Sequence, residues 1–273
     1  MLWAQLGPLG SLVDLPDVLP VQITAERGSS ELTTIGGRRH VQRGVRAPRA
    51  WAVSSTWLQP QAAAFLEACA QDAVPGPLYL LTSDAAVANL LPPHLAAPGA
   101  GGDRSLGALG TNPSTVTVPG IGPMRGVAFP TSPGPWSETV PVRPSVALTL
   151  SCWAASPSTI GSGAGLLSWR TVNAAGAQVA SGIVTAPGGT TTLRATTSFT
   201  PAASAVGVQL RPQTVVAGTL TAIRLTEGPP ATTDWVAGRG GARVVVEDPA
   251  QTLNLVRGST SFADYSWVLK EVG

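Results

Sequence analysis

Short apolar runs separated by turn residues set the hydrophobic pattern of this chain. Residues 21–25 and 50–54 alternate apolar with small or polar side chains, as half-buried β-strands do. From about residue 115 to residue 227 similar runs recur with Gly, Pro, Ser or Asn between them, which is typical of an antiparallel β-sandwich. The clearest of these runs are 146–151, 165–169, 191–195, 206–210 and 220–225.

One stretch, from Pro60 to about Gln71, has the period of a helix instead. Proline is favoured at the first position of a helix, and four apolar residues follow it at i, i+3, i+4 and i+7 spacing. This stripe indicates packing on a core and not a cofactor site. It consists of Ala62, Phe65, Leu66 and Cys69.

The chain changes character near residues 115 and 228. Before the first change the pattern predicts strands and one helix, and after the second three strand-like runs close the chain. The last segment is short for an independent domain, so we expect it to complete the sheet begun near the N-terminus. The predicted fold class is mainly β: a split β domain with one helix (residues 1–115 and 228–273) and an inserted antiparallel β-sandwich, or jelly roll (residues 116–227).

The composition of the chain limits the classes of binding partner that we expect. Charged residues make up 12% of the chain, about half the usual share, so we expect much of the surface to meet other subunits. The formal net charge of +2 argues against a specific nucleic-acid partner or an anionic membrane. No apolar run is long enough to span a bilayer, and no basic region precedes the first apolar residues, so we expect a soluble, unsecreted protein. Cys69 and Cys152 predict buried thiols in a reducing cytoplasm.

The sequence offers no set of residues for catalysis. His40 and His94 have no serine in a G-x-S-x-G elbow, and the glycine-rich stretch 161–165 lacks the lysine of a phosphate-binding loop. The 15 acidic residues form no recognisable pair for a glycosidase. We therefore expect neither an enzyme, a cofactor nor a metal site, with a cell-wall hydrolase kept as an alternative.

Two sets of motifs are similar to known families. The first set is 37–39, 46–51, Trp57, Pro60, 76–78, 89–92 and 262–272. The pattern of these motifs and their order along the chain resemble those of minor tail proteins of actinobacterial long-tailed phages, and among these the distal tail protein. The second set is 148–154, 167–176, 198–201 and 220–228. It resembles a galactose-binding-like jelly roll of the carbohydrate-binding-module type. Such modules often bind calcium beside an acidic residue of the last strand, where this chain offers only Glu227.

The first resemblance implies a virion structural protein of the tail tip, or baseplate, made in the host bacterial cytoplasm. It implies a homo-oligomeric ring, a hexamer, that joins the tail tube protein to the baseplate hub protein. A ring subunit buries two different faces against its neighbours, which agrees with the low charge. The second resemblance implies adhesion to host cell-wall carbohydrate. A stand-alone lectin-like protein is the main alternative.

Candidate site residues follow from these two interpretations of the sequence. Trp136, Trp153 and Trp169 are the aromatic residues that could stack on a glycan, although Trp153 and Trp169 fall in predicted strands, where core packing is the competing interpretation. The basic residues Arg38, Arg39, Arg43 and Arg46 predict contacts to acids of a neighbouring subunit. Contact with DNA phosphates and a solvated strand pair are the alternatives.

Overall fold

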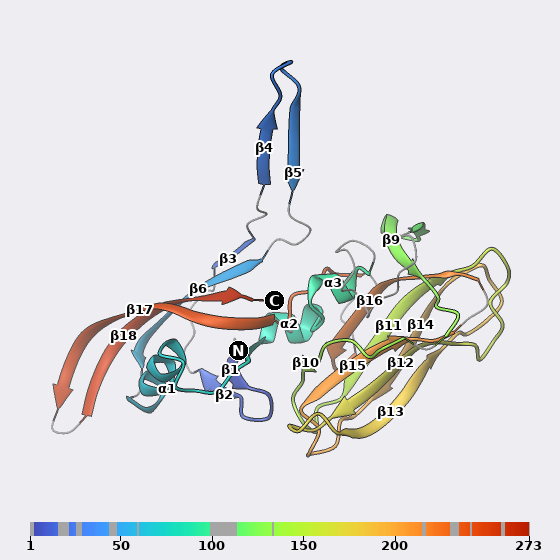
Figure 1. The fold of residues 1–273 in the computed structure, drawn as a ribbon. Helices are drawn as coiled ribbons and strands as arrows, with labels where there is room; N and C mark the ends of the chain where they lie inside the picture. Colours follow the sequence, from blue (N-terminus) through green and yellow to red (C-terminus); the bar gives the residue numbers. More distant parts are fainter. Residues whose placement is uncertain are drawn as a thin grey trace. The chain divides into compact units, whose positions relative to one another are not determined.

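The computed structural model confirms a mainly β protein with short helices and several antiparallel sheets (Figure 1). The chain forms two compact units. Unit 1 comprises Met1–Pro8, Val13–Leu78 and Arg243–Gly273, and unit 2 comprises Leu9–Leu12 and Tyr79–Ala242. The described residues are 3–15, 22–25, 29–43, 48–58, 60–98, 114–132, 134–214, 217–229, 235–240, 242–257 and 260–272.

Unit 1 brings the two ends of the chain into one sheet. In it β17 (Ala242–Arg257), β18 (Thr260–Glu271), β6 (Arg49–Leu58) and β3 (Gln22–Ala25) are successive neighbours, all antiparallel. The short strands β1 (Ala4–Pro8) and β2 (Val13–Leu15) also pair. The strand β7 (Leu78–Thr82) contains the boundary between the two units.

The core of unit 1 follows the alternation of its strands. Trp51 lies opposite Leu269 and Val53 lies opposite Trp267, and all four side chains are buried. The predicted helix is present as α1 (Pro60–Ala70), which packs against β18. Its buried residues Ala63, Leu66 and Cys69 include two of the four stripe positions.

A buried ion pair joins the beginning of β6 to the end of β18. The Arg49 Nε and Nη2 atoms donate to the two carboxylate oxygens of Glu271 at 3.1 and 3.3 Å. Both side chains are less than a tenth exposed. The Arg49 guanidinium also lies 4.9 Å from the ring centroid of Trp51, at cation–π distance.

The end of the chain differs from the expected strands. Two of its three strand-like runs, 242–246 and 252–256, belong to one long strand, β17, whose pairing with β18 shifts register between Glu247 and Ala250. Pro249 lies within this shift; proline has no N–H to donate to a ladder and is tolerated at bulges. The strands β4 (Ser29–Thr33) and β5 (Arg39–Arg43) form a separate two-stranded sheet.

Unit 2 is built on two antiparallel sheets (Figure 1). The four-stranded sheet has the order β10-β15-β12-β13, and the five-stranded sheet has the order β14-β11-β16-β9-β8. The strands are β8 (Ser114–Val118), β9 (Gly122–Ala128), β10 (Val140–Pro141), β11 (Leu148–Ala155), β12 (Gly165–Val172), β13 (Gln178–Thr185), β14 (Thr192–Phe199), β15 (Gly207–Pro212) and β16 (Thr219–Glu227).

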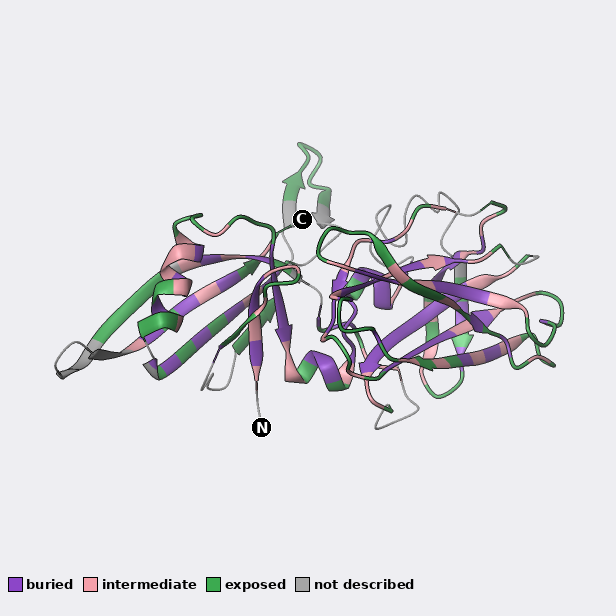
Figure 2. Cartoon of the chain, turned by 90° about the horizontal axis from the view of Figure 1, so that it is seen from below, coloured by how far each residue is buried: buried purple, intermediate pink, exposed green. Residues whose placement is uncertain are grey.

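The interior of the sandwich is formed by alternate residues of these strands, which appear as buried segments in Figure 2. On β11, Leu148, Leu150, Cys152 and Ala154 have no exposed surface. Because successive side chains of a strand point to opposite faces, Trp153 lies on the other face of the same sheet.

Unit 2 extends beyond the predicted junctions at residues 115 and 228, because two further segments pack on β16. The first contains the helices α2 (Ser83–Ala88) and α3 (Pro93–Ala96), both in contact with β16. The second is 235–240, where the Arg239 amide donates to the Asn89 carbonyl at 3.0 Å. We call these two segments the strap.

Candidate functional site

A cluster of Trp136, Arg170 and Arg211 on the four-stranded sheet of unit 2 is the candidate functional site. The guanidinium carbons of Arg170 and Arg211 lie 4.6 and 4.5 Å from the centroid of the Trp136 ring. All three residues are partly exposed. We call this group the Trp136 cluster.

Strand pairing places the two arginines on one face. Arg170 of β12 lies opposite Gln209 of β15, and Arg211 lies opposite Ser168. Their neighbours Val208 and Leu210 are fully buried, so the alternation of β15 turns Gln209 and Arg211 to the outer face of the sheet. Ser137 holds the segment that carries Trp136 beside β15, because the Ser137 amide donates to the Leu210 carbonyl and the Leu210 amide donates to Ser137 Oγ.

Hydrogen bonds orient one side of the Trp136 cluster. Arg170 Nε donates to Gln209 Oε1 at 2.7 Å, and Gln209 Nε2 donates to Thr139 Oγ1 at 2.8 Å. Arg211 Nε is buried and has no acceptor among the described residues. Burial and the nearby Arg211 charge lower the pKa of Arg170. The cluster is thus a partly exposed indole with two guanidinium groups over its ring, one of which is oriented by a hydrogen bond.

The described acidic residues of unit 2 form ion pairs with basic residues outside the Trp136 cluster. Asp84 pairs with Arg239, Glu138 with His94, and Glu227 with Arg143. The Arg143 contact occupies the acid that the sequence offered for calcium. Among the described residues no group of three His, Cys, Asp or Glu could hold a metal ion.

Trp169 lies on the opposite face of β12 from Arg170, where it is partly exposed and contacts the five-stranded sheet. Its ring stacks on Phe199 with centroids 3.8 Å apart and an interplanar angle of 8°. A Cβ at Gly182 would come within 2.5 Å of the Trp169 ring, so the indole lies directly on the backbone of β13. Trp169 Nε1 is buried without a partner in the described part of the chain.

Trp153 is partly exposed on the five-stranded sheet, opposite Arg194 and Thr221. It lies on the outer face of that sheet, whereas Trp136 lies on the outer face of the other one. The three tryptophans considered from the sequence therefore do not come together in one site.

The basic residues predicted for a subunit contact belong to the β4–β5 hairpin or follow it. Arg38 and Arg39 are exposed, and Arg39 forms an ion pair with Glu31. Arg43 ends β5, but its side chain and all of Arg46 lie outside the described residues. The same hairpin exposes Leu32 and Ile35, at 67% and 110% of their reference areas.

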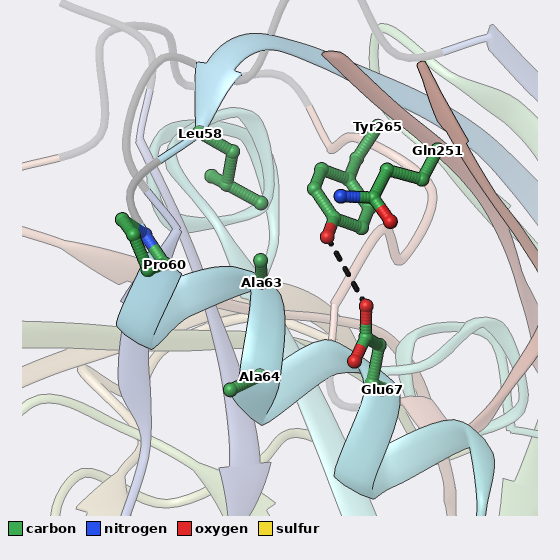
Figure 3. Close-up of a pocket in the computed structure, with 7 residues that line it drawn as sticks. All are labelled: Leu58, Pro60, Ala63, Ala64, Glu67, Gln251 and Tyr265. Carbon is green, nitrogen blue, oxygen red and sulfur yellow. Dashed lines mark hydrogen bonds between the residues drawn. The ribbon is translucent and has the colours of Figure 1, made fainter. Parts of the chain in front are cut away.

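Unit 1 contains a small open pocket of about 120 Å³ between α1 and the strands β6, β17 and β18. Figure 3 shows the Tyr265 hydroxyl directed at Glu67, to which it donates at 3.1 Å. Burial, this hydrogen bond and the Glu67 charge raise the pKa of Tyr265. The other lining residues are Leu58, Pro60, Ala63, Ala64 and Gln251.

The two cysteines are free and buried. Burial raises the pKa of the Cys69 thiol to about 11 and that of Cys152 to about 12. Because the thiolate is the nucleophile and the metal ligand, neither residue adds to a reactive site. Among the described helices none is long and apolar enough to cross a membrane.

Sequence reasoning singled out Trp136 and missed its two arginines. A signal for the two arginines was present in the sequence. Polar residues occupy every second position in two otherwise apolar strands, at Ser168 and Arg170 and at Gln209 and Arg211. Such alternation marks the solvent face of a strand, but the pairing of β12 with β15 was needed to place both arginines beside one tryptophan.

Comparison with known proteins gives distant structural likeness and no sequence family. No family model matches the chain, and no curated protein matches its sequence. A family 16 carbohydrate-binding module is similar over 43% of this chain and 87% of its own, with 16% identity and a TM-score of 0.32. A carbohydrate-binding module of Cellvibrio mixtus lichenase 5A, in complex with cellotriose, is similar over 43% and 88%, with 16% identity and a TM-score of 0.28.

A phage protein is among the similar structures. The enzymatically active domain of tailspike protein 4 of bacteriophage CBA120 matches over 42% of this chain, with 18% identity and a TM-score of 0.28. The match spans only 15% of that tailspike chain. The likeness of this chain to these proteins is thus distant and concerns the fold alone.

Proposed function

We propose that this chain is a non-enzymatic structural subunit of a phage tail tip whose unit 2 adheres to glycan of the host cell wall. The Trp136 cluster is the observation that carries the adhesive part. Guanidinium and amide groups at the surface can donate to hydroxyl oxygens of a sugar. The part of the Trp136 indole that the two guanidinium groups leave uncovered can contact the apolar face of the sugar ring. Trp136, Arg170, Arg211 and Gln209 supply these groups on one sheet face.

Sequence resemblance supports the tail-tip part of the proposal. Four of the stretches that resemble distal tail proteins lie wholly or partly in β6, α1 and β18, and β18 is a neighbour of both β6 and α1 in unit 1. The two chain ends therefore share one unit, as a split tail-ring domain requires. A hexameric ring between tail tube and baseplate hub is the assembly we propose for this unit.

A binding assay tests the adhesive part. Purified full-length chain is sedimented with cell walls of a panel of actinobacteria, because the resemblance points to hosts in that group. We expect Trp136→Ala to reduce the bound fraction about tenfold, since a lost aromatic contact and its associated hydrogen bonds are worth roughly 1–2 kcal/mol.

Trp153→Ala is the matched control, because Trp153 is also partly exposed but lies on the other sheet. Equal loss in the two variants would contradict the assignment of the site to the Trp136 cluster. Release of soluble sugar from the walls by the wild-type chain would instead support the hydrolase alternative.

Native mass spectrometry and negative-stain microscopy test the assembly part. We expect rings from the wild-type chain, alone or with tail tube and hub proteins, and weaker rings from the double variant Arg38→Ala, Arg39→Ala. A wild-type chain that binds wall glycan but stays monomeric even with these partners would favour a stand-alone lectin.

A further inference from the structure

We infer that the ligand of the Trp136 cluster is an acidic glycan, in which a carboxylate or phosphate group on the sugar binds the guanidinium groups of Arg170 and Arg211. This inference rests on the proposed glycan binding and specifies its chemical class. The observation that carries it is the juxtaposition of two arginines on one indole without a carboxylate beside them among the described residues.

The positive charges of Arg170 and Arg211 repel each other. Both guanidinium carbons lie within 5 Å of the same ring centroid, and the effect of Arg211 on Arg170 is repulsive. Cation–π contact offsets part of this repulsion. The negative charge of an oxyanion bound to both guanidinium groups would offset the remaining repulsion. Each of its hydrogen bonds would also be charge-assisted, and such a bond is about twice as strong as a neutral one.

The described part of unit 2 provides no acid for this purpose. Asp84, Glu138 and Glu227 each bind a different basic residue. The hydrogen-bond partner of Arg170 is a neutral amide, that of Gln209. Three other arginines of the unit have partners of their own: Arg143 and Arg239 pair with carboxylates, and Arg224 Nε donates to the Ala88 carbonyl at 2.8 Å.

The arrangement suits an oxyanion better than a neutral ring alone. Gln209 accepts from Arg170 Nε, which leaves the terminal Nη groups of Arg170 to a ligand, and a planar guanidinium edge matches carboxylate and phosphate geometry. Ser181 of β13 lies opposite Arg170, on the same face, where its hydroxyl can meet the remainder of the sugar.

Chemical treatment of the wall distinguishes the two sources of negative charge. Hydrofluoric acid removes phosphodiester-linked polymers, and carbodiimide with an amine converts carboxylates to amides. We expect one of the two treatments to abolish sedimentation of the full-length chain with the walls. We also expect added salt to weaken binding to untreated walls, because an exposed charge contact is screened.

Matched arginine variants localise the effect. Arg170→Gln and Arg211→Gln are each expected to weaken binding about 10- to 100-fold, the range for a hydrogen bond to a charged group. Arg125→Gln removes the same charge from an exposed position of β9 and is expected to leave binding unchanged. Circular dichroism of each variant verifies its fold.

A defined ligand gives a second measurement. Calorimetric titration with an oligogalacturonate and with its methyl ester compares an acid with a neutral molecule of the same ring. Binding to walls that survives both chemical treatments, or an ester bound as tightly as the acid, would overturn the acidic ligand while leaving glycan binding intact. Unchanged affinity in both arginine variants would also overturn it, and failure to bind any wall would overturn both proposals.

Discussion

Asn89 shows how much a single buried side chain contributes to unit 2. Its amide nitrogen donates to the carbonyls of Ile223 and Val236 at 3.1 and 2.9 Å, and its oxygen accepts from the amides of Leu91 and Leu225 at 3.2 and 3.1 Å. The side chain has no exposed surface. It therefore satisfies all the hydrogen-bonding capacity of an amide and ties both segments of the strap to β16.

We predict that Asn89→Ala lowers the free energy of unfolding of unit 2 by about 3–5 kcal/mol. Three buried backbone groups, those of Leu91, Leu225 and Val236, lose the partner that Asn89 gives them, while the Ile223 carbonyl keeps the Trp235 indole N–H. Each unsatisfied group costs roughly 1–3 kcal/mol before relaxation. Chemical denaturation of the full-length chain measures the change. Asn173→Ala is the control, because Asn173 accepts from the Ala175 and Ala177 amides in an exposed turn, where water can replace it; a similar loss in both would contradict the role of burial.

Tyr265 makes the stability of unit 1 depend on alkaline pH. Its pKa is raised in the folded state by burial and by Glu67, so the unfolded chain ionises first, near pH 10. The stabilisation is fully present below that pH and is lost as the pH rises through the folded pKa.

We therefore predict that Glu67→Gln lowers the pKa of Tyr265 and makes the decline in unfolding free energy above pH 10 shallower. Absorbance of tyrosinate during a pH titration and denaturation at pH 9 to 11 measure the two effects. Tyr265→Phe should remove the difference between the two pH profiles. Identical profiles for wild type and Glu67→Gln would contradict the assigned cause.

At the level of elements, the strap depends on a close approach between the backbones of its two segments. A Cβ at Gly238 would lie 2.3 Å from the Leu91 carbonyl oxygen, and one at Gly240 would lie 2.6 Å from that of Leu90. Segment 235–240 therefore needs glycine where it passes 89–92. The Trp235 indole N–H adds contacts to the Ala96 and Ile223 carbonyls, both at 3.2 Å.

We predict that Gly238→Ala destabilises unit 2 by about 1–3 kcal/mol, the usual cost of overpacking, and increases amide exchange in 89–92 and 235–240. Hydrogen exchange followed by mass spectrometry measures this. Gly161→Ala is the control, because a Cβ there meets nothing within 4 Å. Unchanged protection of both strap segments in Gly238→Ala would show that the contact is not needed.

The strap also shows where prediction of elements succeeded and where it failed. The strand at 206–210 and the helix at 60–70 follow from their period because each has one buried face. The strand at 220–225 was predicted as well, although it is buried along its whole length. β13 was not predicted, since its small and polar residues give no apolar stripe. The placement of α2 and α3 on β16, and of 235–240 beside 89–96, depends on contacts between residues more than a hundred positions apart, which no local period records.

For the whole molecule, the ion pair of Arg49 and Glu271 joins parts of the chain that are 222 residues apart. Breaking a buried pair leaves one uncompensated charge, which typically costs about 3–5 kcal/mol. We predict that Arg49→Ala destabilises unit 1 by about this amount while the unfolding of unit 2 is unchanged.

Differential scanning calorimetry of the full-length chain measures this prediction. Lys270→Ala is the matched control, because Lys270 and Glu247 form an exposed pair that is expected to contribute at most about 1 kcal/mol. Equal shifts in the two variants, or an equal shift of both units in Arg49→Ala, would contradict the assigned role.

Local pattern was sufficient for the β-rich class, the helix at 60–70 and the presence of a sandwich, because periodic burial is imposed residue by residue along each strand and helix. It also placed Trp136 in a loop near the surface. Pairing between distant strands decided the rest: it placed Trp169 against Phe199, set Trp153 on the other sheet and brought Arg170 and Arg211 to Trp136. These outcomes depend on register and on long-range packing, which the order of residues encodes only through the complete fold.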